Sequence, residues 1–307
     1  MEPRGAIAAA TTAMLYGSAY VATAIALEGF TPVGLAVWRG AIGALLVAVL
    51  LATPFLPGHR PRALGGAGLV RLGVMGIIGG GLFILAMNAA VAASGATITA
   101  FVAGLYAVLA AALAIPLLGE HLEARTIAAL GAALVGTVML SGIGSGSADA
   151  GGIALGLVAA AAFGTFLVLS RRWSARHRLT SPTVALSTLS ISTLVALGVA
   201  AAGGDPLVRP DPPVGSLVAL GWLAAGPGAA ASVLVVIGMR RLPARHASAF
   251  LLLNPPTAAL LAFVLLGETL DGLQLVGAAL VLVAIAAASG ALPTPGRAGS
   301  HGDASGP

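Results

Sequence analysis

The sequence contains no cysteine and no lysine, and only 8% of its residues are charged. Without cysteine, the chain can form neither a disulfide nor a thiolate metal site. Without lysine, it cannot form the P-loop GxxxxGK[ST], so ATP hydrolysis would have to come from another subunit. A soluble domain carries roughly a quarter of charged residues, because its surface faces water. The scarcity of charge therefore excludes an ordinary soluble protein.

The chain is instead rich in apolar residues, which make up 58% of it and give a mean hydropathy of +1.03. Its 43 glycines lie within long apolar runs rather than polar tracts, so they do not indicate disorder. Small residues of this kind let membrane helices pack closely against one another. The composition predicts an all-α integral membrane protein that crosses the bilayer several times.

Ten apolar runs are long enough to cross a bilayer, which takes about 20 residues. The first run begins like a secretion signal, but it continues to about Leu27 and is therefore interpreted as an uncleaved helix. Residues 291–307 are polar and rich in glycine and proline, which predicts a disordered tail. The ten predicted transmembrane helices cover residues 5–27, 33–53, 69–92, 97–118, 126–143, 152–170, 183–203, 215–238, 246–266 and 272–290.

The 15 arginines test this count, because the cytoplasmic loops of membrane proteins are rich in positive charge. With a cytoplasmic N-terminus, thirteen arginines fall in inner loops or at the termini, and Arg209 alone falls in an outer loop. We therefore expect both termini, including the tail, to be cytoplasmic. The arginines are scattered among short loops, so the net charge of +5 indicates orientation in the membrane and not nucleic-acid binding.

Short stretches of the sequence occur twice. LLGEHLEA closes the fourth predicted helix, and LLGETLDG closes the ninth. LYGSA in the first helix is echoed by AFGTF in the sixth at nearly the same interval. Five helices in each copy would make the second copy enter the membrane in the opposite orientation. We therefore predict two inverted-topology repeats of five helices, residues 1–143 and 151–290, an architecture common among secondary transporters.

This arrangement resembles the drug/metabolite transporter superfamily, specifically its ten-helix members with two EamA-type domains. The resemblance covers residues 5–290. It rests on the motif P-x6-R, which runs from Pro32 to Arg39, and on Pro255, which stands 13 residues before Glu268. The resemblance implies a carrier in the plasma membrane, the inner membrane of a bacterium.

The second repeat matches the family pattern more fully than the first. Gly277 opens the tenth helix nine residues after the Gly-Glu pair, whereas Ala107 and Ala129 stand where the first repeat would carry the equivalents of Pro255 and Gly277. These differences weaken the transfer of detail to the first repeat and leave the expected fold unchanged. The resemblance further implies efflux of metabolites, amino acids or drug-like compounds.

Arg39 is the one charged residue well inside a predicted transmembrane helix. A charge in the bilayer is costly unless it is paired or hydrated, so Arg39 is a candidate to bind an anionic group of the solute. The alternative is that Arg39 reaches the outer surface or pairs with Glu28 and only anchors the helix. Trp38 is a second candidate contact, with anchoring at the membrane interface as the alternative.

Four further candidates for substrate binding fall near the middle of their helices. Polar and aromatic side chains at this depth line the central cavity of many transporters, and the alternative is ordinary helix packing. The prolines at 255–256 and the GPG sequence at 226–228 remove backbone hydrogen bonds and predict bends. The four candidates are Tyr16, Tyr106, Phe163 and Asn254.

Glu120 and Glu268 stand at the ends of helices, where each is expected to cap the helix that follows it. Glu120 is also close to His121 and Glu123, but this spacing does not match a known metal-ligand pattern. We therefore expect neither a metal nor a cofactor.

The leading hypothesis is a secondary transporter that moves a small organic solute by alternating access around a central cavity. An enzyme is not expected, because no histidine, aspartate or glutamate lies deep in a predicted helix. The alternative is a receptor or accessory subunit that binds a partner without transporting solute. The expected partners are the solute and the lipid bilayer, with a homodimer left open. Glu28 is the carboxylate nearest the membrane interior, so we expect transport without a mid-membrane carboxylate.

Overall fold

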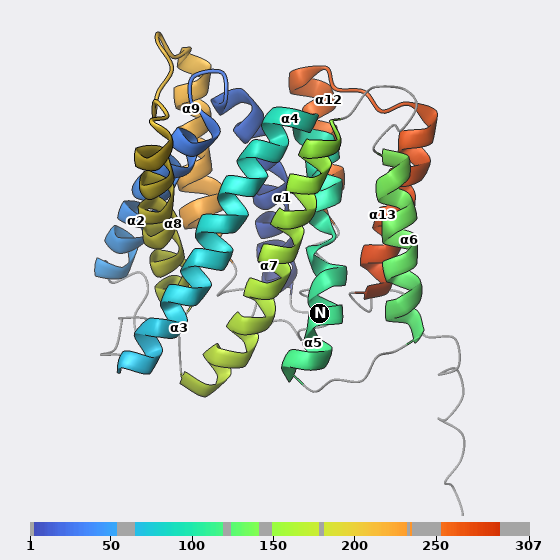
Figure 1. Ribbon diagram of the computed structural model, residues 1–307, viewed down its shortest axis with the longest axis horizontal. Helices are drawn as coiled ribbons and strands as arrows, with labels where there is room; N and C mark the ends of the chain where they lie inside the picture. The colour runs from blue at the N-terminus through green and yellow to red at the C-terminus, as the bar shows by residue number, and fades with distance from the viewer. Residues whose placement is uncertain are drawn as a thin grey trace, which may run out of the picture.

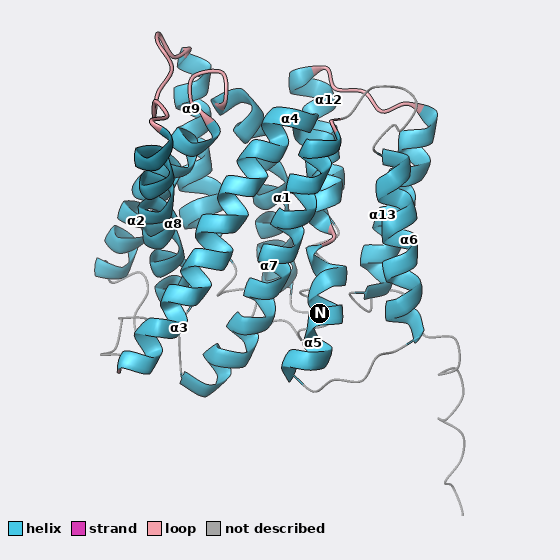
Figure 2. Ribbon diagram, viewed as in Figure 1, coloured by secondary structure: helices cyan, strands magenta, loops and turns pink. Residues whose placement is uncertain are grey.

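Every element of the described chain is a helix (Figure 1), and loops join the helices at their ends (Figure 2). The computed structural model describes residues 3–53, 65–118, 124–140, 149–177, 181–231, 234 and 253–288. Within these ranges the predicted all-α fold is confirmed. The elements are α1 (Pro3–Ala26), α2 (Pro32–Ala52), α3 (Gly66–Gly76), η1 (Ile77–Leu82), α4 (Phe83–Gly104), α5 (Tyr106–Leu118), α6 (Ala124–Leu140), α7 (Ala150–His177), α8 (Ser181–Gly203), α9 (Val214–Leu223), η2 (Ala224–Ala230), α12 (Asn254–Leu266) and α13 (Gly272–Ala288).

Several helical stretches are apolar and long enough to cross a bilayer. They are Pro32–Ala52, Gly66–Ala110, Ala150–Trp173 and Pro182–Gly203. The second of these has 45 residues, which is long enough for two crossings. Shorter apolar helices cover Ile127–Leu140, Val214–Ala230, Asn254–Leu266 and Gly272–Ala287. Together these helices identify an integral membrane protein, as the composition predicts.

Several helices recur along the chain at an interval of 148 residues, the interval that separates Tyr106 from Asn254. These two residues begin α5 and α12, whose last residues are separated by the same interval. The first and last residues of α6 and α13 correspond in the same way, as do the first residues of α3 and α9. A π-helical segment follows each of the latter two helices, η1 after α3 and η2 after α9. Among the described residues, the corresponding helices of the two parts therefore follow the same order, including an interrupted third helix.

The described carboxylates and most of the described arginines outside the helix interior lie toward opposite ends of the helix bundle, whose connections Figure 1 shows. One end, which we call the acidic end, includes the connections from α1 to α2, from α8 to α9 and from α12 to α13. Arg71 on α3 and Arg171 and Arg172 on α7 lie at the opposite end, which we call the arginine end. The carboxylates of the described residues all lie at or next to the acidic end: Glu28, Asp149, Asp205, Asp211, Glu268 and Asp271.

Glycines allow helices from the two parts of the chain to meet closely. Gly136 on α6 faces Gly277 on α13, and a Cβ added to either would lie 2.8 or 2.7 Å from the carbonyl oxygen of the other. Gly80 in η1 lies against the carbonyl oxygen of Thr188 on α8, where a side chain would not fit. The abundance of glycine in the sequence thus serves contacts between helices.

Gly95 divides α4 into two helical parts. Its φ of 78° and ψ of 173° are not helical, and a residue with a Cβ would be strained there. The chain rises through α3 and the first part of α4, turns at the acidic end, and runs back toward α5 (Figure 1). The second part of α4 ends at Gly104, and α5 begins two residues later with Tyr106. The break at Gly95 therefore sets the start of the helical path that carries Tyr106.

Candidate functional site

Arg39 lies in the second turn of α2, and only 7% of its surface is exposed. Thr31 caps the start of the helix, because its hydroxyl oxygen accepts the Gly34 N–H at 3.0 Å. Pro32 follows at the first helical position, where its lack of a backbone N–H leaves no donor unpaired. Gly40, next to Arg39, lies against Thr193 on α8 and brings the two helices together. Local capping and close packing thus hold this part of α2 in the interior.

The Arg39 guanidinium is buried without a complete set of partners. Its Nε and Nη1 atoms make no hydrogen bond within the described chain. Neither atom bonds Glu28, whose side chain is exposed, so the alternative of an ion pair with Glu28 gains no support. A buried cation with unpaired donors is costly in a membrane protein and marks a place where an anionic ligand would be favoured.

Two tyrosines of α1 lie near Arg39. Both Tyr16 and Tyr20 interact electrostatically with its guanidinium group. Tyr16 is half-buried and Tyr20 is 5% exposed. The sequence analysis did not select Tyr20, although residues four positions apart share one face of a helix and the position of Tyr16 could have pointed to it.

Tyr106 and Asn254 bring α5 and α12 into the same region. The Asn254 side-chain amide donates a hydrogen bond to the Tyr106 hydroxyl oxygen at 3.3 Å. Both residues are buried, and Tyr106 also interacts electrostatically with Tyr20 and Tyr16. The Asn254 Oδ1 atom is buried without a hydrogen-bond partner. We call Tyr16, Tyr20, Arg39, Tyr106 and Asn254 the Arg39 cluster.

Aromatic rings adjoin the Arg39 cluster on one side. Phe163 of α7 meets Tyr106 edge to face, with ring centroids 5.0 Å apart. Phe163 also stacks on Phe83 of α4 at 4.7 Å and on Phe166 at 5.7 Å. Gly79 of η1 lies against the Phe166 ring, where a Cβ would collide with it. The π-helical segment therefore permits this aromatic stack, which provides an apolar surface beside the polar groups.

Trp38 does not join the other five predicted residues, because its side chain points outward with 40% of its surface exposed. A ring contact and a hydrogen bond join Tyr106 to Phe163 and Asn254, and Tyr16 interacts electrostatically with Arg39 and with Tyr106. The exposed position of Trp38 on a membrane helix agrees with the alternative role of an interface anchor.

Further buried polar atoms lack partners and were not selected from the sequence. Asn88 on α4 donates to the Pro32 carbonyl oxygen at 2.9 Å, but its Oδ1 atom is unpaired. The Thr23 hydroxyl, on α1, is also buried without a partner. Such atoms are costly in an apolar environment unless water or a ligand reaches them.

The expectation for Glu268 requires a correction. Glu268 does not cap α13, the helix that follows it, but accepts the N–H groups of Ala96 and Thr97 in α4, each at 2.8 Å. The start of α13 already has a capping box, in which Asp271 accepts the Gln274 N–H at 2.8 Å and donates its own N–H to the Gln274 side chain at 3.0 Å.

Glu120, His121 and Glu123 lie outside the described residues. The expectation that Glu120 caps the helix after it therefore stays a prediction. Within the described ranges, no three metal-ligating side chains lie together.

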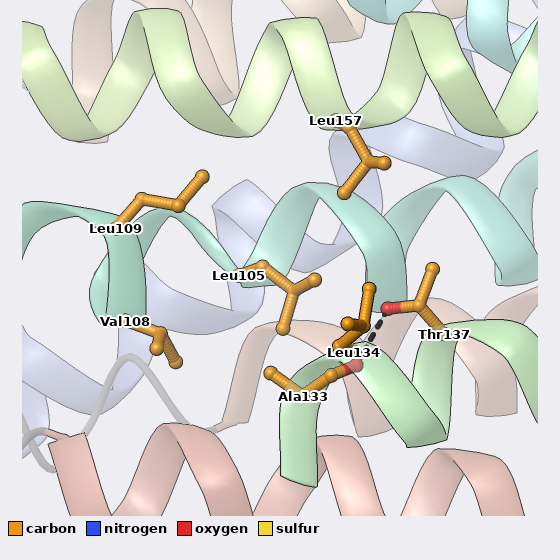
Figure 3. A pocket seen from close by; sticks show the side chains of 7 residues that line it. All are labelled: Leu105, Val108, Leu109, Ala133, Leu134, Thr137 and Leu157. Carbon is orange, nitrogen blue, oxygen red and sulfur yellow. Dashed lines mark hydrogen bonds between the residues drawn. The ribbon is translucent and has the colours of Figure 1, made fainter. Parts of the chain in front are cut away.

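An apolar crevice of about 290 Å³ lies between α5, α6 and α7 (Figure 3). Leu105 in its wall is next to Tyr106 in the chain, but no member of the Arg39 cluster lines the crevice. The hydroxyl of Thr137, the one polar side chain in the lining, is already bonded to the Ala133 carbonyl oxygen at 2.8 Å. The crevice can therefore accept apolar groups but offers nothing to the charged part of a solute.

Comparison with known proteins bears on the domain organisation and the fold. The sequence profile of the EamA-like transporter family matches residues 3–142 and again residues 150–290, which confirms the two tandem domains. One solved structure, described only as "Crystal structure of protein", aligns with a TM-score of 0.65 and 22% identity over 92% of this chain and 96% of its own. At this identity the likeness concerns the fold alone. No curated protein sequence matches the chain significantly.

Proposed function

The chain belongs to the EamA-like transporter family, and on this premise we propose that it exports small organic solutes by alternating access around the Arg39 cluster. The expected solutes are metabolites, amino acids or drug-like compounds that carry an anionic group. The family is one of solute transporters, so a small molecule and the lipid bilayer are the partners. The proposal requires no cofactor.

The observation that carries the proposal is the buried Arg39 guanidinium with two unpaired nitrogen atoms. Arginine binds carboxylates and similar groups through two parallel hydrogen bonds, which are stronger than bonds between neutral groups. The Tyr106–Asn254 pair supplies further hydrogen-bonding groups, and the ring of Phe163 supplies an apolar surface. A solute with an anionic group and an apolar body would satisfy all three.

We further propose ten transmembrane helices in two inverted repeats, 1–143 and 151–290, with a disordered cytoplasmic tail at 291–307. The constant interval of 148 residues between corresponding helices supports the repeat. The separation of carboxylates from arginines supports a cytoplasmic arginine end and an external acidic end. Both termini would then be cytoplasmic, and the membrane would be the plasma membrane. The family match does not support a homodimer, and the proposal does not require one.

The alternative is a receptor or accessory subunit that binds a solute at the same cluster without moving it. The two functions predict the same binding and differ only in net movement across the membrane. An enzyme is not proposed, since the described carboxylates lie at or next to the acidic end of the bundle, away from the Arg39 cluster.

The test begins with a panel of carboxylic acids, each paired with its uncharged amide. The solutes whose accumulation differs between cells with and without the protein are then tested in proteoliposomes that contain the purified chain. We expect time-dependent movement of at least one acid into or out of the vesicle lumen. Saturable binding without movement would support the receptor, and an absence of both across the panel would contradict the proposal.

A further inference from the structure

Glu268 makes a contact that the proposed function does not use. Its Oε1 atom accepts the Ala96 N–H and its Oε2 atom accepts the Thr97 N–H, each at 2.8 Å. The bonds join residues 172 and 171 positions apart, one in each repeat. Hydrogen bonds to an ionised carboxylate are roughly twice as strong as neutral ones, and a negative charge is favoured at a helix N-terminus. The contact is therefore a firm connection between the two repeats at the acidic end.

Two glycines give this contact its geometry. Gly267 ends α12 in the left-handed conformation, with φ of 68° and ψ of 16°, and thereby turns Glu268 away from the helix axis. Gly95, with its φ of 78°, frees the N–H groups that follow it from the preceding helix. A Cβ at Gly95 would lie 2.9 Å from the Glu268 Oε1 atom, and the φ of 78° would strain any residue other than glycine. The Gly-Glu pair thus serves a contact between repeats.

The same two helical paths carry Tyr106 and Asn254. The part of α4 that Glu268 caps leads through Leu105 to Tyr106, and α12 begins with Asn254 and ends just before Gly267. The two paths are therefore tied at the acidic end by Glu268 and within the protein by the Tyr106–Asn254 hydrogen bond. Any movement that separates them at the acidic end must first break the Glu268 contact.

We propose that Glu268 is a positioning residue of the transport cycle, whose bonds to Ala96 and Thr97 hold the acidic end closed and must break for solute to pass. This inference rests on the proposed function, because only a transporter needs to open that end repeatedly. A contact that is simply structural would stay intact throughout the cycle. The two cases differ in the access of water-soluble reagents to the interior and in the effect of fixing the contact.

The first experiment measures access to the interior. The native chain has no cysteine, so a single Thr23→Cys substitution on α1 gives one buried reporter whose hydroxyl had no partner. Glu268→Gln removes one carboxylate acceptor while keeping the size of the side chain. The reporter is labelled with a thiol reagent that does not cross membranes. Glu268→Gln should raise the labelling rate about tenfold, which is the factor that the loss of one charge-assisted hydrogen bond gives.

The matched control is Asp271→Asn, which removes a neighbouring carboxylate that caps α13. It should leave the labelling rate of the reporter unchanged, and Glu268→Asp should fall between the native residue and Glu268→Gln. Equal labelling in the native protein and Glu268→Gln would overturn the inference, as would equal increases in Glu268→Gln and Asp271→Asn. Labelling does not require transport, so this result is separate from a failure of the proposed function.

The second experiment keeps Glu268 and fixes the contact instead. In the double variant Ser94→Cys and Thr269→Cys, one cysteine lies on each side of the contact in the sequence. The two cysteines are joined by a short, cleavable bifunctional thiol reagent. Transport of a confirmed solute should stop after joining and return when the reagent is cleaved. The same reagent applied to each single-cysteine variant should have no effect. Undiminished transport by the joined protein would show that the contact need not break and would overturn the inference.

Discussion

Asn254 donates a hydrogen bond to Tyr106 at 3.3 Å across the boundary between the two tandem domains, and the two residues stand at corresponding positions of the repeat. They begin α5 and α12, and the 148 residues between them are also the interval between α6 and α13. The Arg39 cluster therefore includes a direct hydrogen bond between the two domains.

The Tyr106–Asn254 bond should contribute measurably to stability. Tyr106→Phe and Asn254→Leu each remove one partner, and the double variant removes both. Hydrogen bonds between membrane helices average about 0.6 kcal/mol and reach about 1.7 kcal/mol, so we expect a coupling energy in this range. Thermal unfolding of the four proteins in detergent gives the coupling energy through a double-mutant cycle. Strictly additive effects of the two changes would mean that the bond contributes nothing.

Gly80→Ala should destabilise the protein, because the new Cβ would meet the Thr188 carbonyl oxygen on α8. Overpacking of this kind costs about 1–3 kcal/mol. Gly73→Ala is the control, since nothing lies within 4 Å of a Cβ there and the change should stabilise by about 0.4–1 kcal/mol. Unfolding midpoints in detergent should move in opposite directions, and a shift of the same sign in both variants would contradict the packing of η1 on α8.

Reporter fusions should place the two ends of the bundle on opposite sides of the membrane. Fusions after residue 177 and at the C-terminus are expected to read cytoplasmic, and a fusion near residue 208 is expected to read external. The physical reason is the excess of arginine at one end and of carboxylates at the other. A cytoplasmic reading near 208 would refute the proposed topology.

Energy coupling should not depend on a carboxylate in the middle of the membrane. Glu28 is exposed, at the acidic end, as is Asp205, which serves as a matched control. Transport of a confirmed solute by Glu28→Gln and Asp205→Asn, with and without an imposed pH gradient, should equal transport by the native protein. Loss of the response to the gradient in Glu28→Gln alone, with gradient-independent transport retained, would assign the proton to Glu28.

The sequence predicted the elements of the fold better than their contacts. Long apolar runs are sufficient to indicate membrane helices, and the recurring Gly-Glu pair indicated a repeat. The same pattern cannot indicate which helix N-terminus receives Glu268, because Ala96 and Thr97 are more than 170 positions away. The GPG sequence at 226–228 predicted a bend, and η2 lies there, but the sequence does not show that the interruption is a π-helix.

The candidate site residues stay predictions. The sequence shows how deep a residue lies in its helix, and depth was the basis for selecting Tyr16, Arg39, Tyr106, Phe163 and Asn254. The direction of a side chain around the helix depends on neighbouring helices. Trp38 and Arg39 are adjacent in the chain, yet the first points outward and the second is buried. Tyr20 was overlooked because it stands one turn beyond the middle of its helix.

The most direct test of the central claim is the role of Arg39 in selecting an anionic solute. The measurement is uptake into proteoliposomes of a confirmed carboxylic acid and of its amide, by the native protein, Arg39→Gln and Arg209→Gln. Arg209 is exposed at the acidic end and receives the same chemical change away from the cluster.

We predict that the native protein and Arg209→Gln prefer the acid to the amide about tenfold or more, the factor for a charge-assisted hydrogen bond. In Arg39→Gln the ratio of the two rates should fall close to one, with the amide still transported. The ratio is insensitive to the amount of folded protein, since both solutes use the same vesicles. An unchanged preference for the acid in Arg39→Gln would contradict the account.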